Sequence, residues 1–345
     1  MERAEASTIR VRVPAKVNLL LGVGPRRPDG YHDVVTVLQT VSLHDVLTLT
    51  LHDDVNGAHP ALRSRMQVSL TLGDSGGADG VPADDRNLVL VAARLLMAHL
   101  GMGGVDGERT VEASAYPMAG GGGPGGGPRT RLQLDKRIPV AAGMAGGSAD
   151  AAAALVGLNR LWRSGLDVDE LSGIAALAGS DVPFCVTGGT ALATGTGTSV
   201  VRALTRTRMH WVVGIDRSPL STADVYAAFD DLPAPPPVDP HPVLKALRAG
   251  DVDALAGLVR NDLEPAAIVL RPALAARRDA MLEAGALAAL VSGSGPTMLG
   301  LARDADHAAA IAGQVRGHFD AVEVVTSPAG GPELVPPMRP EPIPA

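Results

Sequence analysis

The chain is organised around a stretch of small residues near its middle, which reads Ile138-Pro139-Val140-Ala141-Ala142-Gly143-Met144-Ala145-Gly146-Gly147-Ser148-Ala149-Asp150. An Ala- and Leu-rich segment follows, and it predicts a helix over residues 151–162. Backbone amides at a helix N-terminus, joined to a loop without bulky side chains, form an anion site that suits phosphate. The alternative is a turn of small residues that only lets a helix pack tightly on a sheet.

The spacing of this stretch differs from that of two common phosphate-binding motifs. No Gly-Lys-Ser/Thr closes the turn, as a Walker A loop requires, and the stretch lacks the Gly-x-Gly-x-x-Gly of a dinucleotide fold after its first strand. If the turn binds phosphate, it is therefore a different type of phosphate-binding loop.

The composition favours an enzyme that acts on a small molecule. The 345 residues are enough for two domains, and 46% of them are hydrophobic although only 2% are aromatic, so aliphatic side chains must fill the core. The net charge of -7 argues against partners such as nucleic acid or a membrane surface. We find no long apolar run and no secretion signal, so we expect a cytoplasmic protein. The single cysteine, Cys185, excludes an internal disulfide.

Periodicity predicts an α+β first unit. Alternating segments predict strands over residues 9–13, 34–43, 46–51, 66–72 and 131–135, and helical patterns cover residues 88–100 and 168–178. Residues 119–128 are almost entirely Gly and Pro, which predicts a flexible loop.

A second unit is predicted to begin near residue 200. Strands are expected at residues 211–215, 290–292, 298–301 and 321–325, and helices at 244–259, 272–284 and 307–315. This alternation suggests an α+β sandwich that resembles a ferredoxin-like unit. We therefore divide the chain into domains at 1–200 and 201–326, followed by a tail at 327–345 whose seven prolines predict disorder.

Polar residues follow the first predicted strand in two short motifs. Lys16 lies in Pro-Ala-Lys-Val-Asn, and together with Asn18 it can reach a cleft at a strand end, although most lysines are simply solvated. The second motif is Asp29-Gly30-Tyr31-His32, in which Asp-Gly is a turn signal. Tyr31 and His32 either form a stacking platform or pack at the start of the next strand.

Two further turns carry candidate functional groups. Asp181 follows a Gly that ends a predicted helix, in Gly-Ser-Asp-Val-Pro, and is either a general base or the cap of a short helix. Ser292-Gly293-Ser294-Gly295 is a turn with free backbone amides, and by itself it is a weak signal because such turns are common.

These five motifs occur in the order found in GHMP-type small-molecule kinases, which the chain resembles from about residue 10 to residue 326. The resemblance implies an α+β two-domain fold, with an N-terminal domain like the second domain of ribosomal protein S5 and a ferredoxin-like C-terminal domain. The Pro-Ala-Lys-x-Asn, Gly-Tyr-His and Ser-Asp-Val-Pro segments look most like those of the kinases that act on a cytidyl-diphosphate alcohol in the non-mevalonate isoprenoid pathway.

The resemblance also implies an activity and a set of roles. ATP would phosphorylate the 2-hydroxyl of the methylerythritol part of the substrate with Mg²⁺ present, and Lys16 and Asp181 would be the catalytic pair. Residues 139–149 would hold the triphosphate, with Asn87 and Lys136 near the adenine. The substrate-binding residues implied are Asn18, Tyr31, His32, Thr222, Tyr226, Gly293 and Ser294.

One departure limits the resemblance. Many members carry Gly-Leu-Gly-Ser-Ser in the turn, whereas residues 143–148 here read Gly-Met-Ala-Gly-Gly-Ser, so the Mg²⁺ ligands of other members cannot be transferred. We expect a monomer or a homodimer. The alternatives are a homoserine or mevalonate type of GHMP kinase, and a catalytically silent nucleotide sensor with the same fold.

Overall fold

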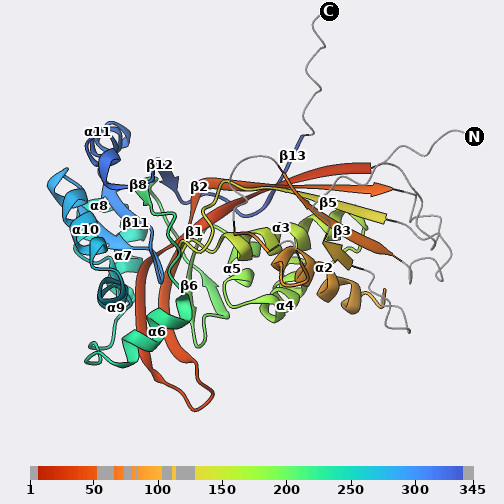
Figure 1. Cartoon of the computed structure of the whole chain (residues 1–345), viewed down its shortest axis with the longest axis horizontal. Coiled ribbons are helices and arrows are strands. Elements are labelled where there is room, and N and C mark those ends of the chain that lie inside the picture. Colours follow the sequence, from red (N-terminus) through yellow and green to blue (C-terminus); the bar gives the residue numbers. More distant parts are fainter. Residues whose placement is uncertain are drawn as a thin grey trace, which may run out of the picture.

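The computed structural model describes residues 7–52, 66–73, 80–82, 84–102, 111–113 and 129–336. Two units lie side by side, each built on its own β-sheet (Figure 1). Within these described ranges, the first sheet has nine strands and the second has four. This arrangement agrees with the expected α+β architecture.

A long antiparallel pair of strands, β1 (Ser7–Arg26) and β2 (His32–His52), forms the centre of the first sheet. The sequence predicted two strands where β2 is continuous. The pairing passes the polar residues His44 and Asp45 because a bulge between Pro14 and Ala15 absorbs the irregularity. The hairpin tip projects beside helix α6 (Thr222–Asp230) of the second unit (Figure 1).

The other strands extend this sheet in the order β13-β1-β2-β5-β3-β4. Their bounds are β3 (Gln67–Leu72), β4 (Val111–Ala113), β5 (Arg129–Asp135) and β13 (Glu333–Val335). Strands β6 (Thr190–Thr194), β7 (Ser199–Arg202) and β9 (Arg260–Asn261) pair at its margins. One face carries the helices α2 (Leu88–His99), α3 (Gly146–Leu161), α4 (Val168–Ala178) and α5 (Val182–Thr187) (Figure 1).

Small residues let α3 lie close to the sheet. Its alanines are buried, and it packs against both β1 and β2. A Cβ atom at Gly157 would lie only 2.7 Å from Leu49 Cδ1, so a larger residue there would force the buried Leu49 side chain to shift. Tight packing on the sheet therefore explains the small residues in the body of the helix. The small residues of the turn before the helix remain available for the site.

The second sheet has the strand order β10-β11-β8-β12, and all of its pairs are antiparallel. Its strands are β8 (Met209–Ile215), β10 (Ala288–Val291), β11 (Met298–Ala302) and β12 (Ala321–Ser327). This is the ferredoxin-like order, which confirms the expected class. Helices α10 (Ala273–Glu283) and α11 (Ala305–Val315) pack on it, and a 3₁₀ turn η1 (Arg316–His318) follows.

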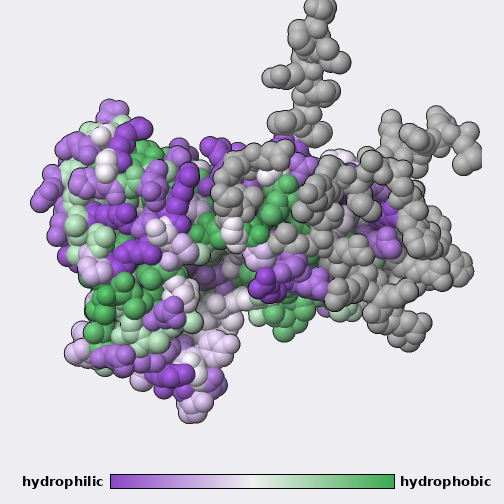
Figure 2. Space-filling model, in the orientation of Figure 1, coloured by the Kyte–Doolittle hydropathy of each residue, from purple (hydrophilic) through white to green (hydrophobic). Residues whose placement is uncertain are grey.

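The helix predicted over residues 244–259 is in fact two helices, α7 (His241–Ala249) and α8 (Val252–Ala256). Gly250 ends α7 with φ at 77°, and the side chain of Asp251 caps α8 by accepting a hydrogen bond from Ala254 N. Helix α9 (Glu264–Leu270) follows and carries the exposed side chains of Val269 and Leu270. Figure 2 shows an apolar area near this helix on a surface that is otherwise mostly hydrophilic over the second unit.

The first part of the proline-rich C-terminal segment is ordered, which corrects the predicted disorder of residues 327–336. Strand β13 pairs with β1, and Arg12 forms an ion pair of 2.7 Å with Glu333. Residues 119–128 and 337–345 lie outside the described residues. The predicted domain boundary, between residues 200 and 201, falls within β7 of the first sheet, and β8 is the first strand of the second sheet. No helix among the described residues is long and apolar enough to cross a membrane.

Candidate active site

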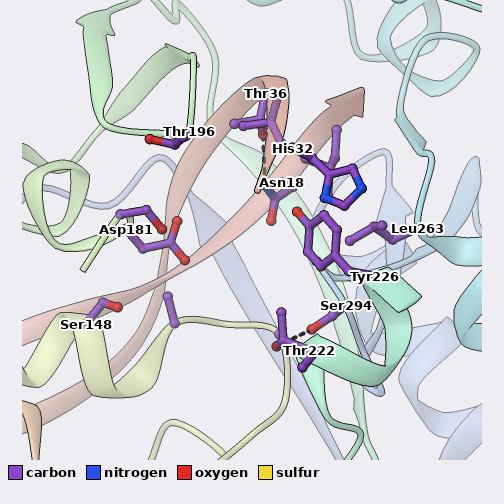
Figure 3. Close-up of a pocket in the computed structure, with 18 of the residues that line it drawn as sticks. Asn18, His32, Thr36, Ser148, Asp181, Thr196, Thr222, Tyr226, Leu263 and Ser294 are labelled. Carbon is purple, nitrogen blue, oxygen red and sulfur yellow. Dashed lines mark hydrogen bonds between the residues drawn. The ribbon is translucent and has the colours of Figure 1, made fainter. Parts of the chain in front are cut away.

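A cavity of about 920 Å³ lies where the two units meet, and both units contribute to its wall (Figure 3). The first unit supplies residues of β1, β2 and the glycine-rich turn, and the second supplies α6 and the turn after β10. The predicted site residues that line it are Lys16, Asn18, Tyr31, His32, Ala141, Ala142, Gly143, Ala145, Gly146, Gly147, Ser148, Asp181, Thr222, Tyr226, Gly293 and Ser294.

The glycine-rich turn is held against β1 and leaves its amides available. Lys16 N donates a hydrogen bond of 3.2 Å to Met144 O, which fixes the turn beside the predicted catalytic lysine. Ala145 precedes α3 with φ at 54° and makes no side-chain capping bond. The N-cap residue therefore leaves the amides at the N-terminus of α3 without a side-chain cap, which is the arrangement that suits an anion.

The turn after β10 contacts the glycine-rich turn directly. Ser292 Oγ donates to Gly143 O at 3.1 Å, and a Cβ atom at Gly143 would lie 1.9 Å from Ser292 O. On the same side, the hydroxyls of Thr222 and Ser294 are 2.9 Å apart (Figure 3). The second unit thus brings its own hydroxyl groups to the predicted phosphate loop.

Lys16 and Asp181 meet in this cavity. Lys16 Nζ lies 3.3 Å from Asp181 Oδ2 and donates a 2.9 Å hydrogen bond to Asn18 Oδ1. The Lys16 side chain is only 7% exposed, compared with 36% for Asp181, so Lys16 is not a solvated surface lysine. Asn18 is fixed in turn by donating from Nδ2 to Thr36 Oγ1 at 2.8 Å.

Asp181 occupies the N-cap position of α5, yet its side chain accepts no capping hydrogen bond. The carboxylate points into the cavity instead (Figure 3). The geometry therefore favours a role in the cavity over the helix-cap alternative.

An aromatic cluster forms the opposite end of the cavity. The rings of His32 and Tyr226 are 5.0 Å apart, and Phe229 meets His32 edge-on at 6.0 Å. His32 Nε2 lies 2.7 Å from Asp230 Oδ1, and because a carboxylate only accepts, Nε2 carries the proton. Burial, assisted by the charge of Asp181, raises the pKa of Tyr226 to about 12. Tyr31 is 67% exposed at the rim.

Lys136 does not line the cavity. It is buried beneath the turn, where it pairs with Asp45 and, at 2.7 Å, with Asp150. Burial alone would lower its pKa, but the two carboxylates outweigh burial and raise it. Asp45 Oδ1 also accepts from Ile138 N at 2.8 Å, so this group anchors the start of the turn.

Five other predicted nucleotide contacts also lie away from the lining: Asn87, Pro139, Val140, Met144 and Ala149. Asn87 caps α2, because its Oδ1 accepts from Val89 N at 2.9 Å and its Nδ2 donates to Pro82 O at 2.7 Å. The next residue, Leu88, does reach the cavity. Ala149 is buried in the first turn of α3.

Sequence reasoning missed Thr36, Thr196 and Asp230, all of which line the cavity. Thr36 and Asp230 act by fixing Asn18 and His32, and no local pattern marks either of them.

Burial raises the pKa of the Cys185 thiol, which keeps it protonated. Within the described ranges, no group of three or more His, Cys, Asp or Glu side chains could hold a metal ion.

Two family models match the chain, in agreement with the site and the fold. Residues 87–189 match the GHMP kinases N terminal domain, and residues 243–321 match the GHMP kinases C terminal model. The first of these ranges contains the glycine-rich turn and Asp181. The class of protein is therefore that of the GHMP kinases.

Individual relatives narrow this class. The 4-diphosphocytidyl-2-C-methyl-D-erythritol kinase of Salinispora arenicola is 45% identical over 91% of this chain and 89% of its own length. The kinase of the same name from Mycolicibacterium gilvum is 42% identical over 97% and 95%. A crystal structure of 4-(cytidine 5'-diphospho)-2C-methyl-D-erythritol kinase covers 93% of this chain and 100% of its own, with a TM-score of 0.68 and 30% identity. The chain belongs to this family of kinases.

A likeness in fold extends further than the family. A homoserine kinase from Cytophaga hutchinsonii has a TM-score of 0.67 at 19% identity, over 97% of this chain and 99% of its own. At that level of identity the comparison shows a shared fold alone.

Proposed function

We propose that this chain transfers the γ-phosphoryl group of ATP to the 2-hydroxyl of 4-diphosphocytidyl-2-C-methyl-D-erythritol, in the non-mevalonate pathway to isoprenoid precursors. The observation that carries the proposal is the Lys16–Asp181 pair, at 3.3 Å, between a helix N-terminus that no N-cap side chain bonds and an aromatic cluster. A triphosphate and a nucleoside base could approach the pair from opposite ends of one cavity.

Asp181 is the proposed general base. An alcohol is a weak nucleophile until a carboxylate orients it and accepts its proton as the new bond to phosphorus forms. The Asp181 carboxylate is about one-third exposed, so a substrate hydroxyl can reach it. Lys16 would hold this carboxylate in place and offset negative charge on the phosphoryl group in transfer.

The glycine-rich turn is the proposed site of the triphosphate. Gly146, Gly147 and Ser148 lie at the cavity wall with the amides of the first turn of α3. Mg²⁺ fits this donor set, because it is commonly held by one or two protein oxygens together with substrate phosphates. The Ser148 hydroxyl, at the cavity wall, would be a protein ligand to the ion, which would neutralise phosphate charge.

The cytidine end of the substrate is proposed to bind at His32 and Tyr226. Both rings offer a face for stacking, and Tyr31 at the rim can cover the base from the other side. Asn18, Thr222 and Ser294 line the cavity near this cluster (Figure 3), and Gly293 lines it beside Ser294, so these residues suit the diphosphate and the methylerythritol part. Asn87 and Lys136 would support nucleotide binding indirectly, through α2 and the base of the turn.

An ADP-release assay with purified protein tests the proposal. We expect turnover with the cytidyl alcohol and none above background with homoserine or mevalonate. Turnover with homoserine or mevalonate alone would show that the chain is another type of GHMP kinase. Tight ATP binding without turnover of any alcohol would favour a nucleotide sensor. We expect a functional monomer or homodimer, in the cytoplasm where ATP is supplied.

A further inference from the structure

The C-terminal segment 327–336 returns from the second unit and lies across the first unit (Figure 1). We call this segment the strap. It starts at Ser327, whose Oγ accepts a 2.8 Å hydrogen bond from Trp211 Nε1 in the second sheet, and it ends in β13, which pairs with β1. It is therefore attached to both units.

The strap is bonded to Thr40, a fully buried residue that lies opposite Lys16 in the β1–β2 pair. Ala329 N donates to Thr40 O at 3.0 Å, and Thr40 Oγ1 donates to Ala329 O. The same hydroxyl accepts from Gly189 N at 3.1 Å, and Thr40 N donates to Gly189 O at 2.9 Å. Thr40 thus joins the strap, the strand pair that carries Lys16, and the residue that follows the end of α5.

The strap also packs directly on the end of α5. A Cβ atom at Gly188, the C-cap of this helix, would lie 2.3 Å from Gly331 Cα. A Cβ atom at Gly331 would lie 3.1 Å from Thr187 O. Asp181 is the N-cap of the same six-residue helix, so movement at one end of α5 displaces the carboxylate at the other.

We propose that the strap is a positioning segment that sets the separation between Lys16 and Asp181. This inference rests on the catalytic roles proposed above for that pair. The hydrogen bonds to Thr40 hold the strand opposite Lys16, and the packing of the strap on Gly188 holds α5, the helix whose N-cap is Asp181. Since a displacement of about 1 Å can cost roughly 100-fold in rate, disturbing the strap lowers turnover without removing any substrate contact.

Two adjacent glycines provide a matched test in the full-length chain. Gly331→Val places a branched side chain against backbone atoms of α5, whereas a Cβ at Gly330 meets nothing within 4 Å. Neither glycine has a positive φ, so the backbone itself tolerates both changes. We expect Gly331→Val to lower kcat by about 10-fold or more with KM for ATP and the alcohol within about twofold, and Gly330→Val to match the wild type.

Cys185 provides a second readout, because it is the only cysteine and lies buried within α5. Its rate of reaction with DTNB under native conditions should rise in Gly331→Val and stay unchanged in Gly330→Val. A lower melting temperature with unchanged kcat and unchanged thiol reactivity would show that the strap only stabilises the fold, and would overturn the inference.

If Gly331→Val does not fold, a comparison of Thr40→Val with Thr40→Ser tests the same role of the strap. The serine keeps the hydroxyl that bonds Ala329 and Gly189, so Thr40→Ser should retain kcat while Thr40→Val loses it. Equal kcat in the two folded variants overturns the inference.

Lys16→Met and Asp181→Asn separate the two proposals. Normal turnover in those variants would refute the catalytic roles proposed for Lys16 and Asp181, whereas loss of turnover in them beside normal turnover in Gly331→Val would refute the role of the strap alone.

Discussion

Lys16 shows how a charged side chain can be kept inside the protein. An amine that is only 7% exposed needs partners, and here Asp181 supplies charge while Asn18 supplies an acceptor. Thr36 completes the chain of hydrogen bonds by holding the amide of Asn18. The lysine is therefore held in one position by groups from three different segments, which is what a role in phosphoryl transfer requires.

The ring of Tyr226 should contribute mainly by stacking. Replacing Tyr226 with Ala should raise KM for the cytidyl alcohol by roughly 5- to 150-fold, equivalent to about 1–3 kcal/mol for one base stack, and leave KM for ATP unchanged. Steady-state kinetics in each substrate measure this. Tyr226→Phe is the control: it keeps the ring, and the pKa near 12 means that the lost hydroxyl was protonated at any assay pH. A phenylalanine variant as impaired as the alanine variant would contradict stacking.

The sequence could predict that Lys16 and Asp181 are functional residues more easily than it could predict that they contact each other. Asp181 sits at a helix start, and from the sequence a cap and a general base were both open. The deciding fact is that its side chain makes no capping bond and faces Lys16, 165 positions away in the chain. Such a contact depends on how β1 and α5 pack, and no local pattern contains that information.

Among the secondary-structure elements, the glycine-rich turn depends on a buried charged group beneath it. Lys136 lies between Asp45 and Asp150, so β2, the start of the turn and the first turn of α3 are joined at one point. Three ionisable groups with one positive and two negative charges would leave an excess buried charge, which is costly. Burial outweighs the attraction of Lys136 and raises the pKa of Asp150 well above its usual range, so the folded state favours the neutral carboxyl more than the unfolded chain does.

This raised pKa predicts a pH-dependent stability. The folded state holds a proton that the unfolded chain releases above about pH 4, so the stability due to Asp150 is complete below that pH and is lost as pH rises through the raised pKa. Asp150→Asn cannot titrate, so its free energy of unfolding relative to the wild type should increase as pH rises from 4. Urea unfolding at several pH values measures the difference, and a difference that does not vary with pH would contradict the assignment.

Elements with strong local signals were predicted well, and those with long-range causes were not. Helix α4 has the predicted bounds, residues 168–178, because its Asp167 cap and apolar spacing are local. The interruption expected near Asp45 in β2 does not exist, since the partners of Asp45 are the distant Lys136 and Ile138. The order in residues 327–336 likewise depends on pairing with β1, which a count of prolines cannot reveal.

At the scale of the whole molecule, the site exists because two sheets bring their turns together. Gly143 belongs to the first unit and touches Ser292 of the second so closely that no side chain fits between them. Its φ of 73° also favours glycine. The family resemblance implied substrate contacts for Gly293 and Ser294, and the structure places their turn against the glycine-rich turn.

Gly143→Ala should therefore disturb the whole cavity. We expect the free energy of unfolding to fall by roughly 1–3 kcal/mol, from the left-handed backbone and the overlap with Ser292, and KM to rise for both substrates. Denaturant unfolding and kinetics measure these effects. Gly173→Ala in α4 is the control, because a Cβ there meets nothing within 4 Å. An effect on one substrate alone would contradict a cavity shared by the two units.

The central claim is that the Asp181 carboxylate accepts the proton of the attacking hydroxyl beside Lys16. Asp181→Asn tests it most directly, because the two side chains have the same shape and the aspartate makes no capping bond whose loss would unfold α5. We predict that kcat with the cytidyl alcohol falls by about 10²- to 10⁴-fold while the melting temperature and the KM for ATP stay near those of the wild type. Turnover close to that of the wild type in this folded variant would contradict the account.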